Sequence, residues 1–336
     1  MPTAPLRRLS LRNPLQKAIM RHLSLSFFPP MTNQPVRRPV DFFAFAVCVG
    51  LCFVWGLQQV AIKAAGDAVS PMLQVGLRSA VSGLLLWLFN RYWLKEVWNP
   101  EVKLRDALLV GLCFTGEFFF VSEGLRFTSA AHMSVLLYTA PLFSAVGLAV
   151  KLPEERLNLI QWAGLLLAFC GILVAFLLPA LTEATPEENL WILGDALGLG
   201  AGISWGFATI FLRTTTMNGA PASQMLFWQL ATGAVVLTAI ALLTGQNHFE
   251  STTLGWTSLL FQTFIVSFAS YLVWNWLLRR YLASRLGVFL FMTPIFGVVL
   301  SVLLLDETVG LPFVGGSLLV LVGLLLAQVS RKRRHG

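Results

Sequence analysis

Ten apolar stretches, most of them 20 or more residues long, follow one another along this 336-residue chain with short connections between them. An α-helix needs about 20 apolar residues to cross the roughly 30 Å of hydrocarbon in a bilayer. Charged residues make up only 12% of the chain, so few side chains are available to face water. The sequence therefore predicts an all-α membrane protein with ten transmembrane helices. The predicted spans are 42–65, 70–89, 104–127, 129–150, 158–179, 191–213, 220–244, 254–279, 282–305 and 311–329.

The basic residues give the predicted orientation. With both termini in the cytoplasm, 21 of the 24 Lys and Arg residues fall in cytoplasmic segments, and the opposite loops carry mainly acidic residues. The net charge of +8 comes from short runs between apolar stretches, a distribution that argues against nucleic-acid binding. We expect a multi-pass protein of the cell inner membrane that has the lipid bilayer as its solvent.

Residues 1–40 differ from the rest of the chain. They hold several arginines and serines, no acidic residue, and no apolar run of the roughly 7–15 residues that a secretory signal needs. We interpret them as a basic, disordered tail; Met31 offers a second start directly before the first span. The acidic connection near 179–190 separates a first half, 41–180, from a second half, 191–330.

The second half repeats landmarks of the first. Each half has five predicted spans, an odd number, so the second half enters the membrane from the opposite side. Inverted repeats are typical of secondary transporters, whose binding site lies at mid-membrane between the halves. The matched pairs are Trp55 with Trp205, Gly56 with Gly206, Pro71 with Pro221, Gln74 with Gln224 and Gly83 with Gly233 at an offset of 150, and Glu155 with Glu307, Gly164 with Gly316 and Gly171 with Gly323 at an offset of 152.

Prolines interrupt equivalent helices of the two halves, at Pro141 and Pro294. A proline inside a helix removes a backbone hydrogen bond and frees a carbonyl, which is tolerated where a cavity or a neighbour satisfies it. These matched helix breaks therefore indicate where the binding site lies. Glycines at every fourth position from Gly194 to Gly206 predict a smooth helix face for close packing.

Ionisable side chains at membrane depth are the first candidates for function, because a charge there costs roughly 2.5–3.5 kcal/mol and usually faces a cavity. At 1.5 Å per residue, Arg78 and Glu117 lie about 12 and 15 Å from the outer surface, close enough in depth to meet. In one interpretation Glu117 binds a proton or a substrate amine, and Arg78 sets its charge or holds a substrate carboxylate. In the other, Arg78 forms a permanent pair with Glu117 or Glu123 that only joins two helices.

Polar and aromatic side chains near the same depth are further candidates for lining a cavity. A transmembrane glutamine is as often a helix–helix contact as a substrate contact, and the aromatic residues serve equally well in packing. The chain has no nucleotide-binding motif, nucleophile elbow or metal-ligand spacing, so we expect no cofactor, no metal and no catalytic residue. The candidate lining residues are Trp55, Gln58, Gln59, Tyr138, Trp205, Trp274 and Asn275.

Several stretches resemble a known family. The resemblance is carried by Trp-Gly followed by AIK in the first span, by SP and LR in the second, and by the stretches LRFTSAAHMSVLLYTAPLF and DETVGLPFVGGSLLVLVGLLL. These residues resemble the EamA-type branch of the drug/metabolite transporter superfamily. The resemblance covers 42–329 and implies ten helices, two EamA repeats and a central cavity. It also implies export of amino acids, metabolites or drugs. Glu117 and Glu123 depart from what a generic member carries.

The predicted function is secondary transport of a small metabolite, with export favoured over import. An amino acid is one candidate substrate and a proton one candidate coupling ion. Import or exchange is the alternative within transport. A membrane-embedded enzyme or a sensor is less favoured, because neither acidic clusters near the headgroups nor a soluble output domain is evident. The chain is expected to work as a monomer or a homodimer.

Overall fold

The computed structural model describes residues 41–152, 157–177, 190–281, 286 and 289–327, all within one compact unit of residues 40–336. Within these ranges the chain is helical and forms no strand; one isolated bridge joins Val69 and Phe249. The predicted tail at 1–40 and most of the connection between the halves lie outside the described residues.

The first half begins its helices with local capping interactions. The Asp41 side chain accepts a hydrogen bond from the Ala44 amide at 2.8 Å, and Pro71 occupies the first turn of its helix, where its missing N–H costs nothing. The elements are α2 (Phe42–Ala64), α3 (Pro71–Phe89) with a π-helical extension η1 (Asn90–Leu94), α4 (Leu104–Gly124), α5 (Ala130–Leu137), α6 (Ala140–Lys151), and α7 (Leu159–Ile172) with the π-helical η3 (Leu173–Leu177).

The second half contains a long π-helical segment in the middle of one of its apolar stretches. Such segments are rare and frequently mark functional sites. The elements are α9 (Leu190–Thr214), the short 3₁₀ turn η4 (Thr216–Gly219), α10 (Ala222–Leu243), α11 (Thr253–Leu260), the π-helical η5 (Phe261–Ser270), α12 (Tyr271–Arg280), α14 (Met292–Leu305) and α15 (Leu311–Ala327).

Among the residues that the structure describes, six helices are long and apolar enough to cross a membrane by length and composition, and three shorter apolar helices accompany them. Large apolar side chains such as Leu159, Leu243 and Leu311 are more than four-fifths exposed, which suits lipid and not water. The six spans are Phe42–Ala64, Pro71–Leu94, Ala130–Lys151, Leu190–Thr214, Ala222–Leu243 and Thr253–Trp274, and the shorter helices are Leu159–Ala175, Met292–Leu305 and Leu311–Ala327.

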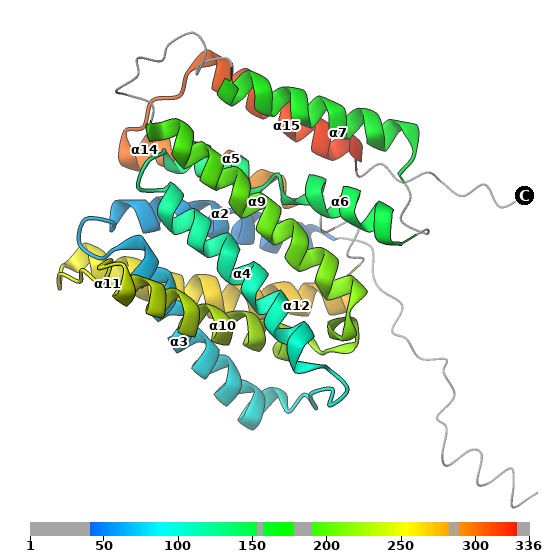
Figure 1. Cartoon of the computed structure of the whole chain (residues 1–336), viewed down its shortest axis with the longest axis vertical. Helices are drawn as coiled ribbons and strands as arrows, with labels where there is room; N and C mark the ends of the chain where they lie inside the picture. Colours follow the sequence, from blue (N-terminus) through cyan, green and yellow to red (C-terminus); the bar gives the residue numbers. More distant parts are fainter. Residues whose placement is uncertain (1–40, 153–156, 178–189, 282–285, 287–288, 328–336) are drawn as a thin grey trace, which may run out of the picture. The chain divides into compact units, whose positions relative to one another are not determined.

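The main helix contacts between the halves follow the internal repeat, in that equivalent helices make equivalent contacts. α3 packs on α10, and α7 packs on α15 (Figure 1), so equivalent helices of the two halves meet. α2 packs on α14, and its equivalent α9 packs on α5 and α6. The contact of α4 with α10 likewise has its counterpart in the contact of η5 with α3. Exchanging the halves therefore reproduces these contacts.

Glycines show the direction of the α7–α15 pair. A Cβ built on Gly164 would lie 2.6 Å from the carbonyl oxygen of Gly323, and one on Gly171 would lie 2.6 Å from that of Gly316. The contacts follow opposite sequence order, so the two helices are antiparallel. Only a hydrogen side chain allows the backbones to approach this closely.

The α3–α10 pair shows the same reversal, because Gly76 lies against Thr238 and Gly83 lies against Leu230. Equivalent helices thus run in opposite directions at both of these contacts. The predicted glycine face of α9 packs on α5 and α6, where a Cβ on Gly202 would lie 2.8 Å from the Leu136 carbonyl oxygen. This packing holds the interrupted helix α5–α6 of one half against the other half.

Candidate functional site

A cavity of about 310 Å³ lies between the two halves. Its volume is at the lower end of the range for small-molecule sites, which suits a metabolite. Its walls come from α2, α4 and α5 of the first half and from α9, α10, α12 and the residue Leu290 of the second. The lining residues are Trp55, Gln58, Gln59, Phe114, Glu117, Phe118, Leu137, Tyr138, Trp205, Ala208, Thr209, Leu212, Ala222, Met225, Leu226, Gln229, Tyr271, Trp274 and Leu290.

The cavity has a deep end and a shallow end. Gln58 and Gln59, in the second half of α2, are buried, as is Tyr138. Leu212, in the last turn of α9, and Ala222, at the start of α10, are half-buried. The cavity therefore extends from mid-depth to the face at which α9 ends and α10 begins, which we call the near face.

Glu117 is the one acidic side chain among the lining residues, and it is 8% exposed. Within the part of the chain that the structure describes, no hydrogen bond or ion pair reaches its carboxyl group. A carboxylate in an apolar, buried position is costly unless a proton or a cation neutralises it. Glu117 is thus placed to take its partner from a ligand or from a proton that enters the cavity.

Arg78 is not part of the cavity wall. It is 1% exposed, its guanidinium carbon lies 4.3 Å from the centroid of the Phe118 ring, and its Nη1 donates to Gln262 Oε1 at 3.4 Å. Phe118 contacts both the cavity and the guanidinium group. Among the described residues Arg78 has no carboxylate within 4.0 Å, so neither predicted ion pair, with Glu117 or with Glu123, is formed.

A buried amide network orients the partner of Arg78. The Nε2 of Gln262 donates to Gln74 Oε1 at 2.7 Å and to Ser258 Oγ at 2.9 Å, which leaves its Oε1 to face the guanidinium. Gln74 is fixed in turn, because its Nε2 donates to the Val69 carbonyl at 2.7 Å. This network joins α3 to α11 and η5 and holds Arg78 in place.

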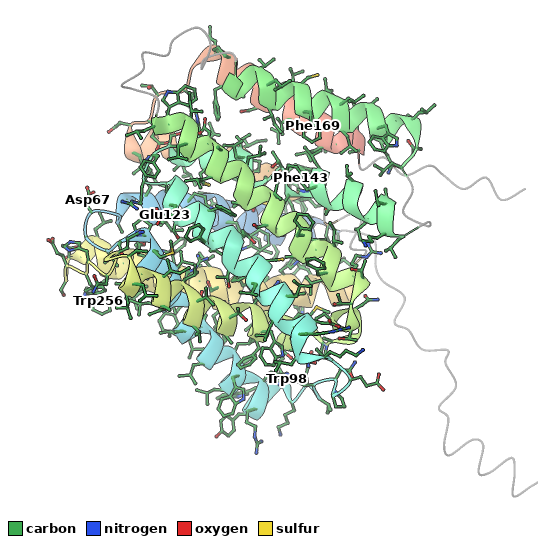
Figure 2. The ribbon with its side chains drawn as sticks, in the orientation of Figure 1. Asp67, Trp98, Glu123, Phe143, Phe169 and Trp256 are labelled. Atoms are coloured by element: carbon green, nitrogen blue, oxygen red, sulfur yellow. The ribbon has the colours of Figure 1, made fainter. Side chains whose placement is uncertain are left out.

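Glu123 lies outside the cavity. It accepts hydrogen bonds from Arg126 at 2.8 Å and from Gln246 at 2.6 Å. Figure 2 shows Glu123 at one end of α4 and Trp98 beyond the other end. The two glutamates of α4 therefore have separate surroundings, as their spacing of six residues in a helix predicts.

Aromatic contacts join the two halves along the cavity. The Trp55 Nε1 donates to Ser270 Oγ at 2.8 Å, and the Trp55 ring lies edge-on to Trp274 with 5.8 Å between centroids. Tyr138 and Trp205 form a second edge-to-face pair at 5.3 Å. Each pair takes one ring from each half, so a relative movement of the halves would change both contacts.

The predicted helix breaks lie beside the cavity. α5 ends at Leu137, and Pro141 lies in the first turn of α6, so the lining residue Tyr138 sits in the break. Pro294 lies in the first turn of α14, shortly after the lining residue Leu290. The two breaks thus border the same cavity from opposite halves.

Seven of the ten predicted lining or coupling residues line this cavity. Arg78 lies behind the wall and Glu123 lies away from it. Asn275 belongs to α12, but its side chain is outside the described part of the structure. The sequence analysis missed two lining residues, Gln229 and Tyr271. Gln229 could have been found as a polar residue within an apolar span, whereas the aromatic pattern does not distinguish Tyr271.

A polar cluster closes the bundle at the far face, where α2 ends and α9 begins. Glu307 accepts hydrogen bonds from the amides of Ala130 at 2.8 Å and Ala131 at 3.0 Å, which caps α5. The Lys63 ammonium lies 3.6 Å from Glu307 and also donates to the carbonyl of Thr128. These contacts tie α2 and α5 of the first half to the second half.

The cluster continues through Asp195, which the sequence analysis did not single out. Thr128 Oγ1 donates to Asp195 Oδ1 at 2.5 Å, and His132 Nδ1 lies 3.0 Å from the same carboxyl group. The His132 ring stacks on Phe313 with 4.4 Å between centroids. We call Lys63, Thr128, His132, Asp195 and Glu307 the far-face cluster.

Comparison with known proteins gives a consistent result over both halves. Residues 42–177 and 192–328 each match the model of the EamA-like transporter family. The chain is 30% identical over 299 residues to a "Probable amino-acid metabolite efflux pump" of Salmonella typhimurium, covering 86% of this chain and 94% of that protein. An uncharacterized transporter of Bacillus subtilis is 26% identical and covers 85% of this chain and 97% of its own length.

One crystal structure superposes on the chain with a TM-score of 0.59 and 18% identity, covering 86% of this chain and 97% of the other. At that identity the likeness concerns the fold alone. It indicates that this arrangement of helices exists in another protein of similar length.

Proposed function

Because the chain belongs to the EamA-like transporter family, we propose that it moves a small metabolite across the cell inner membrane by alternating access. The family resemblance predicted from the sequence is confirmed, and the named relatives are transporters and efflux pumps, not enzymes. The chain is a multi-pass membrane protein with a two-repeat architecture. In our proposal it has ten transmembrane helices in two inverted halves, 41–180 and 191–330, with both termini in the cytoplasm.

One observation carries the proposal: a metabolite-sized cavity between the two halves extends to residues at the near face, while the far-face cluster joins the two halves at the opposite face and lines no part of the cavity. Alternating access requires a central site that is open to one side at a time. The antiparallel contacts between equivalent helices support inverted halves, because exchanging them would exchange the open and closed faces. The predicted orientation puts the near face in the cytoplasm, where an exporter takes up its substrate.

The direction and the substrate are proposed from the relatives. Two similar proteins, from Salmonella typhimurium and Escherichia coli, are each named a "Probable amino-acid metabolite efflux pump", and we propose outward transport of an amino acid or a compound derived from one. Import or exchange is the alternative. We keep both a monomer and a homodimer as the proposed working forms.

We further propose that Glu117 is the coupling residue, which binds either a proton or the substrate. Neutralising it by either partner would remove the cost of a lone charge in the cavity and allow the halves to rearrange. The test is flux in proteoliposomes. Glu117→Gln should abolish flux driven by a pH gradient while the purified protein remains monodisperse.

Glu123→Gln is the matched control, because it makes the same carboxyl-to-amide change on the same helix outside the cavity. It should retain pH-driven flux. Wild-type flux in Glu117→Gln would rule out the coupling role. Metabolites retained and released by cells with and without the protein would identify the substrate and its direction, and counterflow without a gradient would favour exchange.

A further inference from the structure

We infer that the cavity selects small monocationic amines with an apolar or aromatic body and excludes compounds that keep a free carboxylate. The inference rests on the proposed transport function and adds the substrate class: amines, including amino-acid derivatives whose carboxyl group is absent or masked as an amide or ester. It starts from the charges that a ligand in the cavity would meet.

Among the described residues, the wall offers a carboxyl group and no basic side chain. Glu117 is the one ionisable acid on the wall, and none of the lining residues in the described part of the chain is Lys, Arg or His. An ammonium group would neutralise Glu117 and gain a charge-assisted hydrogen bond. A ligand carboxylate would lose its water without meeting a cation, which is strongly unfavourable.

Arg78 does not supply the missing cation. Its guanidinium carbon lies 4.3 Å from the centroid of the Phe118 ring and its Nη1 donates to Gln262, while its buried Nε has no hydrogen-bond partner among the described residues. Gln262 is itself held by Gln74 and Ser258, and none of these three side chains lines the cavity. Arg78 is 1% exposed and is not a lining residue, so a ligand carboxylate in the cavity would not contact it in this arrangement of the side chains.

A second acceptor stands near the deep end. Gln59 lines the cavity, is 2% exposed, and its Oε1 has no hydrogen-bond partner among the described residues. A buried carbonyl oxygen without a donor costs free energy until a ligand provides one. An ammonium has three N–H donors, so it can donate one hydrogen bond to Glu117 and still have donors left for a second acceptor such as Gln59.

The remaining wall suits an organic cation with an apolar body. The rings of Trp55, Tyr138, Trp205, Tyr271 and Trp274 line the cavity. Aromatic faces attract ammonium groups and also bury apolar ligand surface. A small inorganic cation would bury none of this apolar surface, so the wall indicates an amine attached to an apolar group.

The test compares three probes with the same phenylpropanoid body but different charge: phenylalaninamide as the cation, phenylalanine as the zwitterion and 3-phenylpropionate as the anion. Binding to the purified full-length chain in detergent is followed by tryptophan fluorescence. We expect the cation to bind at least about tenfold more tightly than the zwitterion, with no measurable binding of the anion. Glu117→Gln should remove the preference for the cation, and Glu123→Gln should keep it.

Equal affinity for the cation and the zwitterion, or failure of the cation to bind, would overturn the inference even if Glu117→Gln did not fold, because both results come from the wild-type protein. Flux of the same probes in proteoliposomes separates this inference from the proposed function. Selective binding without flux would uphold the ligand class and contradict transport. Flux of the zwitterion at the rate of the cation would uphold transport and contradict the class.

Discussion

The far-face cluster should control which face of the bundle is open, and Glu307→Gln tests this most directly. Glu307 links the α14–α15 connection to the first turn of α5 through two backbone amides and to α2 through Lys63. The change to glutamine keeps the size of the side chain but removes its charge and one acceptor oxygen. It should therefore favour opening of the far face.

The size of the effect follows from these contacts. A hydrogen bond to a charged group contributes about 1.5–3 kcal/mol, and a charge at a helix N-terminus contributes about 0.3–1 kcal/mol. The ion pair with Lys63 adds little, since the Lys63 side chain is 32% exposed and such pairs contribute about 0–1 kcal/mol. We expect Glu307→Gln to destabilise the state in which the far face is closed by about 2 kcal/mol. This corresponds to an approximately 30-fold rise in the population of molecules with the far face open.

Hydrogen–deuterium exchange of the amides in the first turn of α5 measures this population. Exchange there should be about 30-fold faster in Glu307→Gln, with little change in α7 and α15, which pack on each other. Lys63→Met is the comparison variant: it removes the ion pair and the hydrogen bond to the Thr128 carbonyl but keeps the two hydrogen bonds from the α5 amides to Glu307, so exchange of those amides should rise less than in Glu307→Gln. Equal effects of the two substitutions, or no effect of Glu307→Gln, would refute the reasoning.

Three further predictions concern the interior. Arg78→Lys should lower the stability in thermal unfolding by about 1 kcal/mol, because lysine loses the planar contact with an aromatic face; an unchanged midpoint would contradict this. Gly171→Ala should cost about 1–3 kcal/mol, since its Cβ would lie 2.6 Å from backbone of α15, whereas Gly315→Ala has no atom within 4 Å and should leave the unfolding midpoint unchanged. Trp205→Ala should weaken binding of the cationic probe at least about tenfold, and wild-type affinity would exclude this ring from the site.

The sequence alone determined that the protein lies in lipid, which segments form helices, and that the second half of the chain repeats the first. A helix can cross lipid only with a long apolar run, so composition and run length mark the spans without any knowledge of packing. The described helices lie close to the predicted spans, with Phe42–Ala64 for 42–65 and Leu311–Ala327 for 311–329 as examples. The constant rise per residue also predicts the depth of a side chain, and the similar levels of Arg78 and Glu117 stay a prediction.

Only the tertiary structure decided which of these side chains share a space. The position of a residue along a helix gives its depth, but the direction it faces relative to other helices depends on contacts between distant segments. The ring of Phe118, next to Glu117 in sequence, lies against Arg78 and leaves the carboxyl group on the cavity wall. Asp195, which the sequence did not single out, lies beside His132 because packing brings their two helices together. Of the two interpretations of Arg78 and Glu117, the permanent ion pair is not formed among the described residues, although the two groups still interact electrostatically, because packing and not spacing determines which buried groups meet.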